Sequence, residues 1–232
     1  AIGSKYLVML NDGPYYASHT DGVTVENFSG KDWTDALKKY RDATAKSQQP
    51  SANILNSNTG NTGSQDDYKT MRLGYTSAML FDGYYSFDYG DQDHGQTWWY
   101  DEYGAYLGAP KGPAENLTSP GSDLREGLRK REFQNGLVLL NPTYDNQSTE
   151  LFGEYEKLHG VQDKKQNDGS IVSGAMVAPR DGIVLIRPIE KITGTTFTNG
   201  SFVRIFNRYG EVYRTGFFAY EAGYRGGSNV VI

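Results

Sequence analysis

Short apolar runs alternate with polar and helical segments over the first 108 residues of the chain. Four of these runs predict extended strands: KYLVML (5–10), GVTVENF (22–28), SANILNSNT (51–59) and AMLFDGYYSFD (78–88). Residues 31–47 and 64–80 carry apolar side chains at helical spacing, the first segment at Trp33, Leu37 and Tyr40. TWWYDEYGAYLG (97–108) predicts a third, amphipathic helix that ends at Gly108. The alternation of strand and helix predicts parallel βα units for residues 1–108.

The pattern changes to hairpins from about residue 120 onward. Asn135-Gly136 lies between two extended stretches, Asp181-Gly182 repeats this plan, and a third hairpin is expected around residues 208–210. These signals predict an antiparallel β-domain over 125–192, of β-sandwich-like type, and a β-hairpin segment over 193–232. The Gly-, Pro- and Ser-rich residues 109–124 predict a linker. The expected fold class is therefore α/β followed by all-β.

Composition narrows the range of partners. The chain has 232 residues, a formal net charge of -5 and no block of basic residues beyond LREGLRKREF, which argues against recognition of nucleic-acid phosphates. No run reaches the 18 apolar residues typical of a membrane-spanning helix. With no cysteine, the chain has no thiolate metal site and no cysteine nucleophile. The three histidines lack metal-ligand spacing, and we expect neither a metal nor a cofactor.

Polar residues come at the expected strand ends. In parallel βα folds, ligands bind at the carboxyl ends of the strands, where Asp12, Glu26 and Asn56 would lie. Asp82 is expected at the same place, after AMLF. The segment that follows is rich in aromatic and acidic residues, and this combination suits sugars, because rings stack on pyranose faces and two acids can break a glycosidic bond. We expect substrate contacts from Asn56, Tyr84, Tyr85, Trp98, Trp99, Tyr100 and Glu102.

Each of these signals also has a structural interpretation. Asp before Gly is an ordinary turn residue, which applies to Asp12 and Asp82. Residues 98–100 could form the buried face of a helix. Glu26 is harder to explain in this way, because a charge directly after VTV is poorly suited to burial unless it is paired or functional. The acidic run Asp88, Asp91, Asp93 lacks the full spacing of a calcium loop.

A family resemblance rests on LNDG, DGVTVENF, MRLGYTSAMLFDGYYSFDYGD, WWYDEYGAYLG and RKREFQNGLVLLNPT. These motifs, spread over most of residues 1–190, resemble a group of bacterial glycoside hydrolases with a TIM barrel and a C-terminal β-domain. The resemblance implies that Glu26 and Asp82 are the leading catalytic candidates, followed by Asp12. It also implies that residues 1–108 are the C-terminal part of a barrel. The C-terminal residues resemble the lead-in to FG-GAP-like repeats.

The resemblance carries an expectation about size, because a closed (β/α)₈ barrel needs about 250 residues. We therefore expect the chain to be an internal piece of a longer protein, secreted or on the cell surface. The rest of the barrel would come from that protein or from a neighbouring subunit.

Two functions are consistent with the sequence. One is a glycoside hydrolase acting on a polysaccharide or oligosaccharide. The other is a non-catalytic extracellular protein that binds carbohydrate or serves a surface or filament role on the same scaffold.

Overall fold

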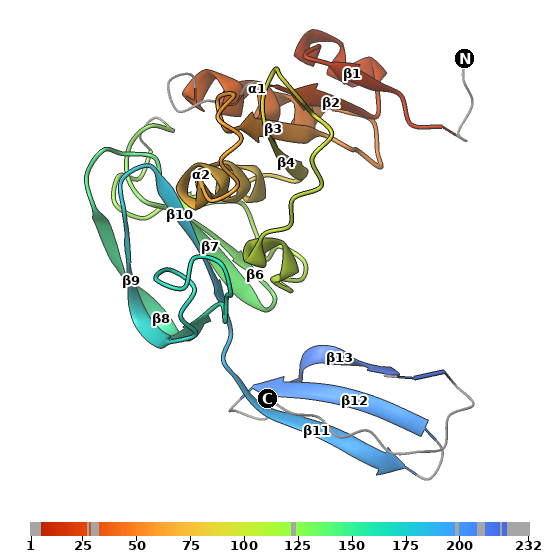
Figure 1. The fold of residues 1–232 in the computed structure, drawn as a ribbon, viewed down its shortest axis with the longest axis vertical. Coiled ribbons are helices and arrows are strands. Elements are labelled where there is room, and N and C mark those ends of the chain that lie inside the picture. Colours follow the sequence, from red (N-terminus) through yellow and green to blue (C-terminus); the bar gives the residue numbers. More distant parts are fainter. Residues whose placement is uncertain are drawn as a thin grey trace.

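The computed structural model describes residues 6–26, 28, 33–121, 124–197, 200–207, 212–218 and 220–221. Within these residues, two α-helices and two 3₁₀ turns accompany a parallel sheet and two antiparallel sheets (Figure 1). The expected order of α/β followed by all-β is confirmed.

The parallel sheet contains β1 (Met9–Asn11), β2 (Gly22–Val25), β3 (Ile54–Asn58) and β4 (Tyr84–Asp88). The strands lie in their sequence order, and each pairs with the next in parallel. The 3₁₀ turn η1 (Pro14–His19) connects β1 to β2, α1 (Trp33–Lys46) leads to β3, and α2 (Tyr68–Met79) leads to β4. The prediction of parallel βα units is confirmed.

Both helices pack on the same face of the parallel sheet. Val25, Leu55 and Tyr85 are aligned in the strand register and belong to this face, where Tyr85 packs its ring against Tyr75 of α2. The indole Nε1 of Trp33 in α1 donates a 2.8 Å hydrogen bond to Ser77 of α2, which joins the two helices. The alternate strand residues belong to the opposite face, which no described helix covers. We call this the bare face.

Helix α2 is the middle layer of the molecule. One side packs on β3 and β4, and the other side packs on β7 (Gly136–Asn141) and β10 (Asp181–Ile186) (Figure 1). Residues 71–78 are therefore buried without interruption around the helix.

The antiparallel sheet combines β7 and β10 with four further strands, in the order β5-β6-β7-β10-β8-β9. These are β5 (Glu115–Asn116), β6 (Arg129–Phe133), β8 (Gln147–Lys157) and β9 (Ile171–Val177). Val138 and Leu140 of β7 join the core shared with α2, whereas Leu137 and Leu139 join a second core on the other face. One curled sheet therefore replaces the expected sandwich, because its own curvature encloses the second core (Figure 1).

The predicted hairpin at Asn135-Gly136 is confirmed by the pairing of β6 with β7. The predicted hairpin at Asp181-Gly182 is wrong, because these residues begin β10, which pairs with β7 and β8. The segment 109–124 contributes β5 to the sheet, and the Lys111 amide donates to Glu132 of β6. The residues of this segment that pair with β6 lie along the edge of the sheet.

The C-terminal sheet consists of β11 (Ile189–Phe197), β12 (Gly200–Asn207) and β13 (Val212–Phe218), joined in antiparallel pairs. The expected third hairpin is confirmed as a strand pair, while its turn at 208–210 lies outside the described residues.

Two predictions within residues 78–108 are wrong. Ala78 and Met79 end α2 rather than begin a strand, so β4 starts only at Tyr84. The expected helix over 97–108 is reduced to the 3₁₀ turn η2 (Asp101–Gly104). In both places tertiary packing overrides the local pattern, because α2 continues into the shared core and Tyr100 is anchored there by its ring.

A buried arginine joins the two halves of the fold. Arg72 of α2 binds both carboxylate oxygens of Asp181 in β10, at 2.9 and 3.0 Å. Its Nη1 lies 2.7 Å from Asp163 and 4.0 Å from Glu102 of η2. Only 5% of the Arg72 side chain is exposed, so these carboxylates supply the partners that a buried guanidinium requires.

Replacing Arg72 tests whether this network holds α2 to the antiparallel sheet. Arg72→Leu leaves Asp181 and Glu102 buried without their cation, and we expect it to lower the free energy of unfolding by about 3–5 kcal/mol. Arg41→Leu is the control, because exposed Arg41 forms its ion pair among the described residues with its neighbour Asp42. This substitution should cost less than about 1 kcal/mol. Urea denaturation measures both, and equal effects would contradict the role of Arg72.

Candidate functional site at the carboxyl ends of the parallel strands

The carboxyl ends of β2, β3 and β4 bring four polar side chains together. Glu26 directly follows β2, Asn56 lies in β3, Asp88 ends β4, and His94 lies in the loop after β4. We call these four residues the carboxyl-edge cluster. The strand register aligns Asn56 with Ser86, two positions before Asp88, so Asn56, Ser86 and Asp88 share the bare face.

Asp88 is the centre of this cluster. Its Oδ2 accepts from the Asn56 amide at 3.2 Å and contacts Nδ1 of His94 at 2.8 Å. Only 5% of Asp88 is exposed, and its buried Oδ1 has no hydrogen-bond partner among the described residues. A buried carboxylate oxygen without a hydrogen-bond partner costs free energy unless a further group, such as a ligand or a water molecule, binds it.

The His94 side chain is 62% exposed. Its hydrogen bond to Asp88 raises the pKa of His94 above the ordinary value, and the negative charges of Asp88, Glu26 and Asp91 act in the same direction. Glu26 is exposed at the same edge.

Asp12 also lies at this edge, directly after β1. Its side chain is half-exposed and lies 4.0 Å from Nζ of Lys39 in α1. The backbone of Asp12 has φ 45°, and its amide donates to Thr24 of β2. Asp12 therefore combines a turn conformation with a position beside the cluster.

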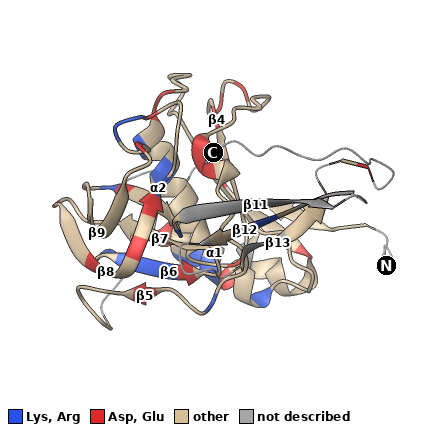
Figure 2. Ribbon diagram, turned by 90° about the horizontal axis from the view of Figure 1, so that it is seen from below, with Lys and Arg blue, Asp and Glu red and all other residues tan. Residues whose placement is uncertain are grey.

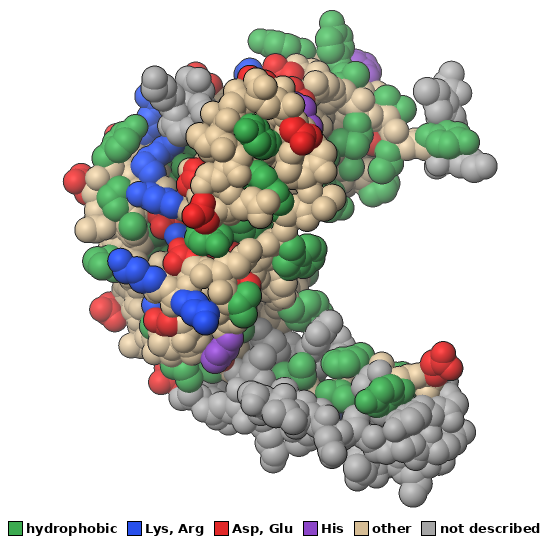
Figure 3. All heavy atoms as spheres, in the orientation of Figure 1, with side chains coloured by type: hydrophobic (Ala, Val, Ile, Leu, Met, Phe, Trp, Pro, Cys, Tyr) green, Lys and Arg blue, Asp and Glu red, His purple; other side chains and the backbone are tan. Residues whose placement is uncertain are grey.

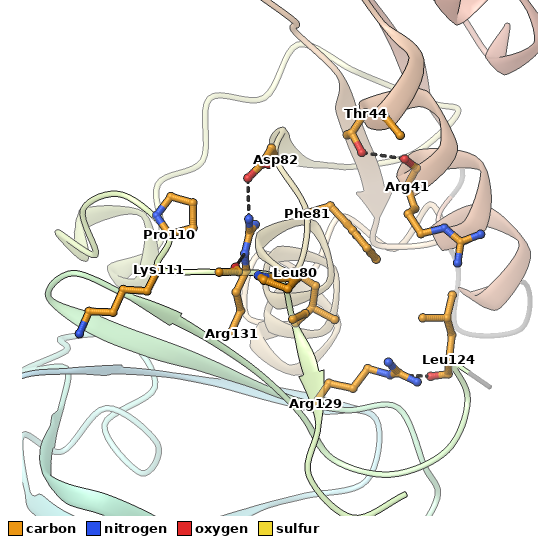
Figure 4. Close-up of a pocket in the computed structure, with 14 residues that line it drawn as sticks. Arg41, Thr44, Leu80, Phe81, Asp82, Pro110, Lys111, Leu124, Arg129 and Arg131 are labelled. Carbon is orange, nitrogen blue, oxygen red and sulfur yellow. Dashed lines mark hydrogen bonds and ion pairs between the residues drawn. The ribbon is translucent and has the colours of Figure 1, made fainter. Parts of the chain in front are cut away.

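The expected position of Asp82 at this edge is wrong. Because α2 extends through Met79, Asp82 precedes β4 and lies at the amino ends of the strands. There its Oδ1 accepts from Arg131 of β6 at 2.7 Å (Figure 4). The adjoining cavity of about 600 Å³ has Asp82 as its one carboxylate, beside Arg41, Lys111, Arg129 and Arg131.

Tyr84 and Tyr85 also lie away from the cluster. Tyr84 begins β4 near Asp82, with 61% of its surface exposed. Tyr85 belongs to the helix face, where its hydroxyl bonds to Ser57 and burial raises its pKa well above the ordinary value. The structure thus separates these tyrosines from the residues at the carboxyl ends.

A second feature of the carboxyl side is a groove of about 400 Å³. The loops after β3 and β4, the start of α2 and the loop between β8 and β9 line this groove, which we call the aromatic groove. Its residues are Gly63, Ser64, Gln65, Asp66, Tyr68, Trp98, Trp99, Tyr100 and Gln162. Trp99 is 69% exposed, Trp98 is half-buried against Phe87, and Tyr100 is buried with its hydroxyl on the Gln65 carbonyl. One flat apolar ring is therefore open to a ligand.

Glu102 lies beneath this region and is only 2% exposed. Its Oε1 accepts from Asn167 at 2.9 Å and faces Arg72. Burial raises the pKa of Glu102, while Asn167 and Arg72 act against the increase. Glu102 belongs to the interface between the halves and does not reach the surface as a sugar contact.

The sequence analysis does not name Asp88 and His94 as candidate site residues. In the sequence, Asp88 stands out only as part of the acidic run that lacks the full spacing of a calcium loop. Among the described residues, no group of acidic and histidine side chains has the arrangement of a metal site. A strand assigned to YYSFD rather than AMLFD would have placed Asp88 at the carboxyl end.

The molecular surface carries charges of both signs. Basic residues of β6 and acidic residues of β8 lie in the same antiparallel sheet (Figure 2). On the face in Figure 3, Lys and Arg side chains are interspersed with Asp and Glu. None of the described helices has both the length and the apolar character needed to cross a membrane.

Comparison with known families assigns the chain to a family. Residues 2–137 match the profile of a family described as hypothetical glycosyl hydrolase family 15, and the chain belongs to this family. The match includes the parallel sheet, the carboxyl-edge cluster and most of the aromatic groove. No curated protein matches the chain.

Proposed function

We propose that this chain forms the carbohydrate site of a glycoside hydrolase at the carboxyl ends of β1–β4. The observation that carries the proposal is the exposed Glu26 beside the Asp88–His94 pair, in a member of a glycosyl hydrolase family. A carboxylate beside a second proton-exchanging group is the arrangement that glycosidic hydrolysis requires. The substrate is a polysaccharide or oligosaccharide.

We also propose that the parallel sheet is part of a (β/α) barrel. Strand order that follows the sequence, with both helices on one face, is the winding of such a barrel. In this arrangement the bare face becomes the barrel interior, and further parallel strands pair with the outer edges of β1 and β4. Those strands come from the same protein or from a neighbouring subunit.

The aromatic groove gives the sugar chain a binding surface beside the cluster. Trp99 offers an exposed ring for stacking, and Gln65, Asp66 and Gln162 offer polar groups for hydroxyls. Because Trp99 follows β4 and Gln65 and Asp66 follow β3, a glycan held there can extend toward Glu26.

Glu26→Gln tests the reaction. The amide has nearly the size of the carboxylate but cannot act as nucleophile or proton carrier, so we expect hydrolysis to be lost while folding is retained. Release of reducing sugar from a panel of plant and microbial polysaccharides by the full-length protein measures the effect.

Asp82→Asn is the matched control, because it makes the same chemical change at the amino ends of the strands. It should leave hydrolysis unchanged. Loss of activity in Asp82→Asn with full activity in Glu26→Gln would contradict the proposal, because it would place the reaction at the amino ends of the strands.

Trp99→Ala tests the groove. Removing the exposed ring should weaken oligosaccharide binding by about 1–3 kcal/mol, judged from the apolar area of one aromatic side chain. Phe152→Ala is the control, because Phe152 is a fully exposed ring on β8. Isothermal titration calorimetry compares them, and unchanged affinity in Trp99→Ala would exclude stacking at this position.

A further inference from the structure

His94 has the geometry of a proton-transferring histidine. Its Nδ1 is held by Asp88 at 2.8 Å, which leaves Nε2 as the nitrogen available to a ligand. No described residue forms a hydrogen bond with Nε2, and the ring is largely exposed at the carboxyl edge. A carboxylate on one ring nitrogen fixes the orientation and the tautomer of a histidine, and the other nitrogen is then free to exchange a proton.

Asp88 is well suited to hold this ring. Its side chain is only 7% exposed, and Asn56 fixes Oδ2 from β3. Among the described residues, the imidazole of His94 is the group that pairs with the negative charge of Asp88, because Oδ1 has no hydrogen-bond partner there. The carboxylate therefore stabilises the protonated ring.

Within the carboxyl-edge cluster the exposed side chains are those of Glu26 and His94, because Asn56 and Asp88 are buried. Asp12, also exposed, follows β1, and its Oδ1 lies 4.0 Å from Nζ of Lys39. His94 complements Glu26 as a proton donor, and the negative charge of Glu26 is among those that raise the pKa of His94.

We propose that His94 is the catalytic residue that transfers the proton in this hydrolysis, and that Asp88 is the positioning residue that holds its ring. The inference rests on the proposed function. The protonated His94 gives the proton on Nε2 to the glycosidic oxygen as the bond to the anomeric carbon breaks. The electron pair of that bond stays on the oxygen, while the Glu26 carboxylate bonds to the carbon. Water then displaces Glu26 and returns one proton to Nε2.

NMR titration of the imidazoles tests the pair without a substrate. His94→Gln identifies the His94 signal, which should titrate above an ordinary histidine because Asp88 favours the charged ring. Asp88→Asn removes that charge and should lower the pKa of His94. An unchanged pKa in Asp88→Asn would overturn the positioning role. The signals of His19 and His159 in the same spectra serve as internal controls, because Asp88→Asn should leave them unchanged.

Kinetics tests the transfer on a glycan that the wild type cleaves. His94→Gln should lower kcat by about 10²–10⁴-fold, as expected for loss of a general acid, with KM little changed. The loss should be much smaller on 2,4-dinitrophenyl glycosides, whose leaving group departs without a proton. Since the acid must be protonated, activity falls as pH rises through the pKa of His94, and Asp88→Asn should move this fall to lower pH.

His159→Gln is the matched control, because His159 is also an exposed histidine paired with a carboxylate, Glu156, but lies in the antiparallel sheet region. It should keep full activity. Full activity and an unchanged pH profile in His94→Gln, with loss in Glu26→Gln, would overturn this inference alone. Failure of the wild type on every glycan, or activity retained in Glu26→Gln, would overturn the proposed function and this inference with it.

Discussion

The buried guanidinium of Arg72 is the interaction on which the arrangement of the two halves depends. One side chain from α2 holds β10 through Asp181, the loop before β9 through Asp163 and the turn η2 through Glu102. Each carboxylate comes from a different element, so the position of all three follows from the position of α2. Because a buried charge is tolerated only with its partners in place, the network favours one docking geometry over others.

This docking explains how the candidate site is built. With η2 held against α2, the chain from β4 to η2 has both ends fixed, and it carries His94, Trp98 and Trp99 over the carboxyl ends of the strands. Asp101 strengthens the same connection, since its Oδ2 accepts from the amides of Val161 and Gln162. The candidate site and the aromatic groove are thus supported by contacts with the antiparallel sheet and its loops. Gln162, in the loop between β8 and β9, is the residue that this half contributes to the lining of the groove among the described residues.

The sequence predicts the periodic elements and misses those decided by tertiary contacts. The helix at Trp33, Leu37 and Tyr40 and the Asn135-Gly136 hairpin carry local signals and are confirmed. The run AMLF is ambiguous, because a short apolar run suits a buried helix end as well as a strand. Its packing in the core shared with the antiparallel sheet stabilises the helix. That one error moves Asp82 to the opposite edge and hides Asp88. The curl of the antiparallel sheet and the Arg72 network join residues about a hundred positions apart, which periodicity cannot reveal.

The central claim is that carbohydrate binds at the carboxyl ends of β1–β4. Mapping backbone amide shifts by NMR while oligosaccharides are added to the protein tests this claim directly. The account predicts perturbations at Glu26, Asp88, His94 and Trp99, with those at Asp82 and Tyr84 unchanged. Perturbations confined to Asp82, Tyr84 and the cavity around Arg131 would contradict it.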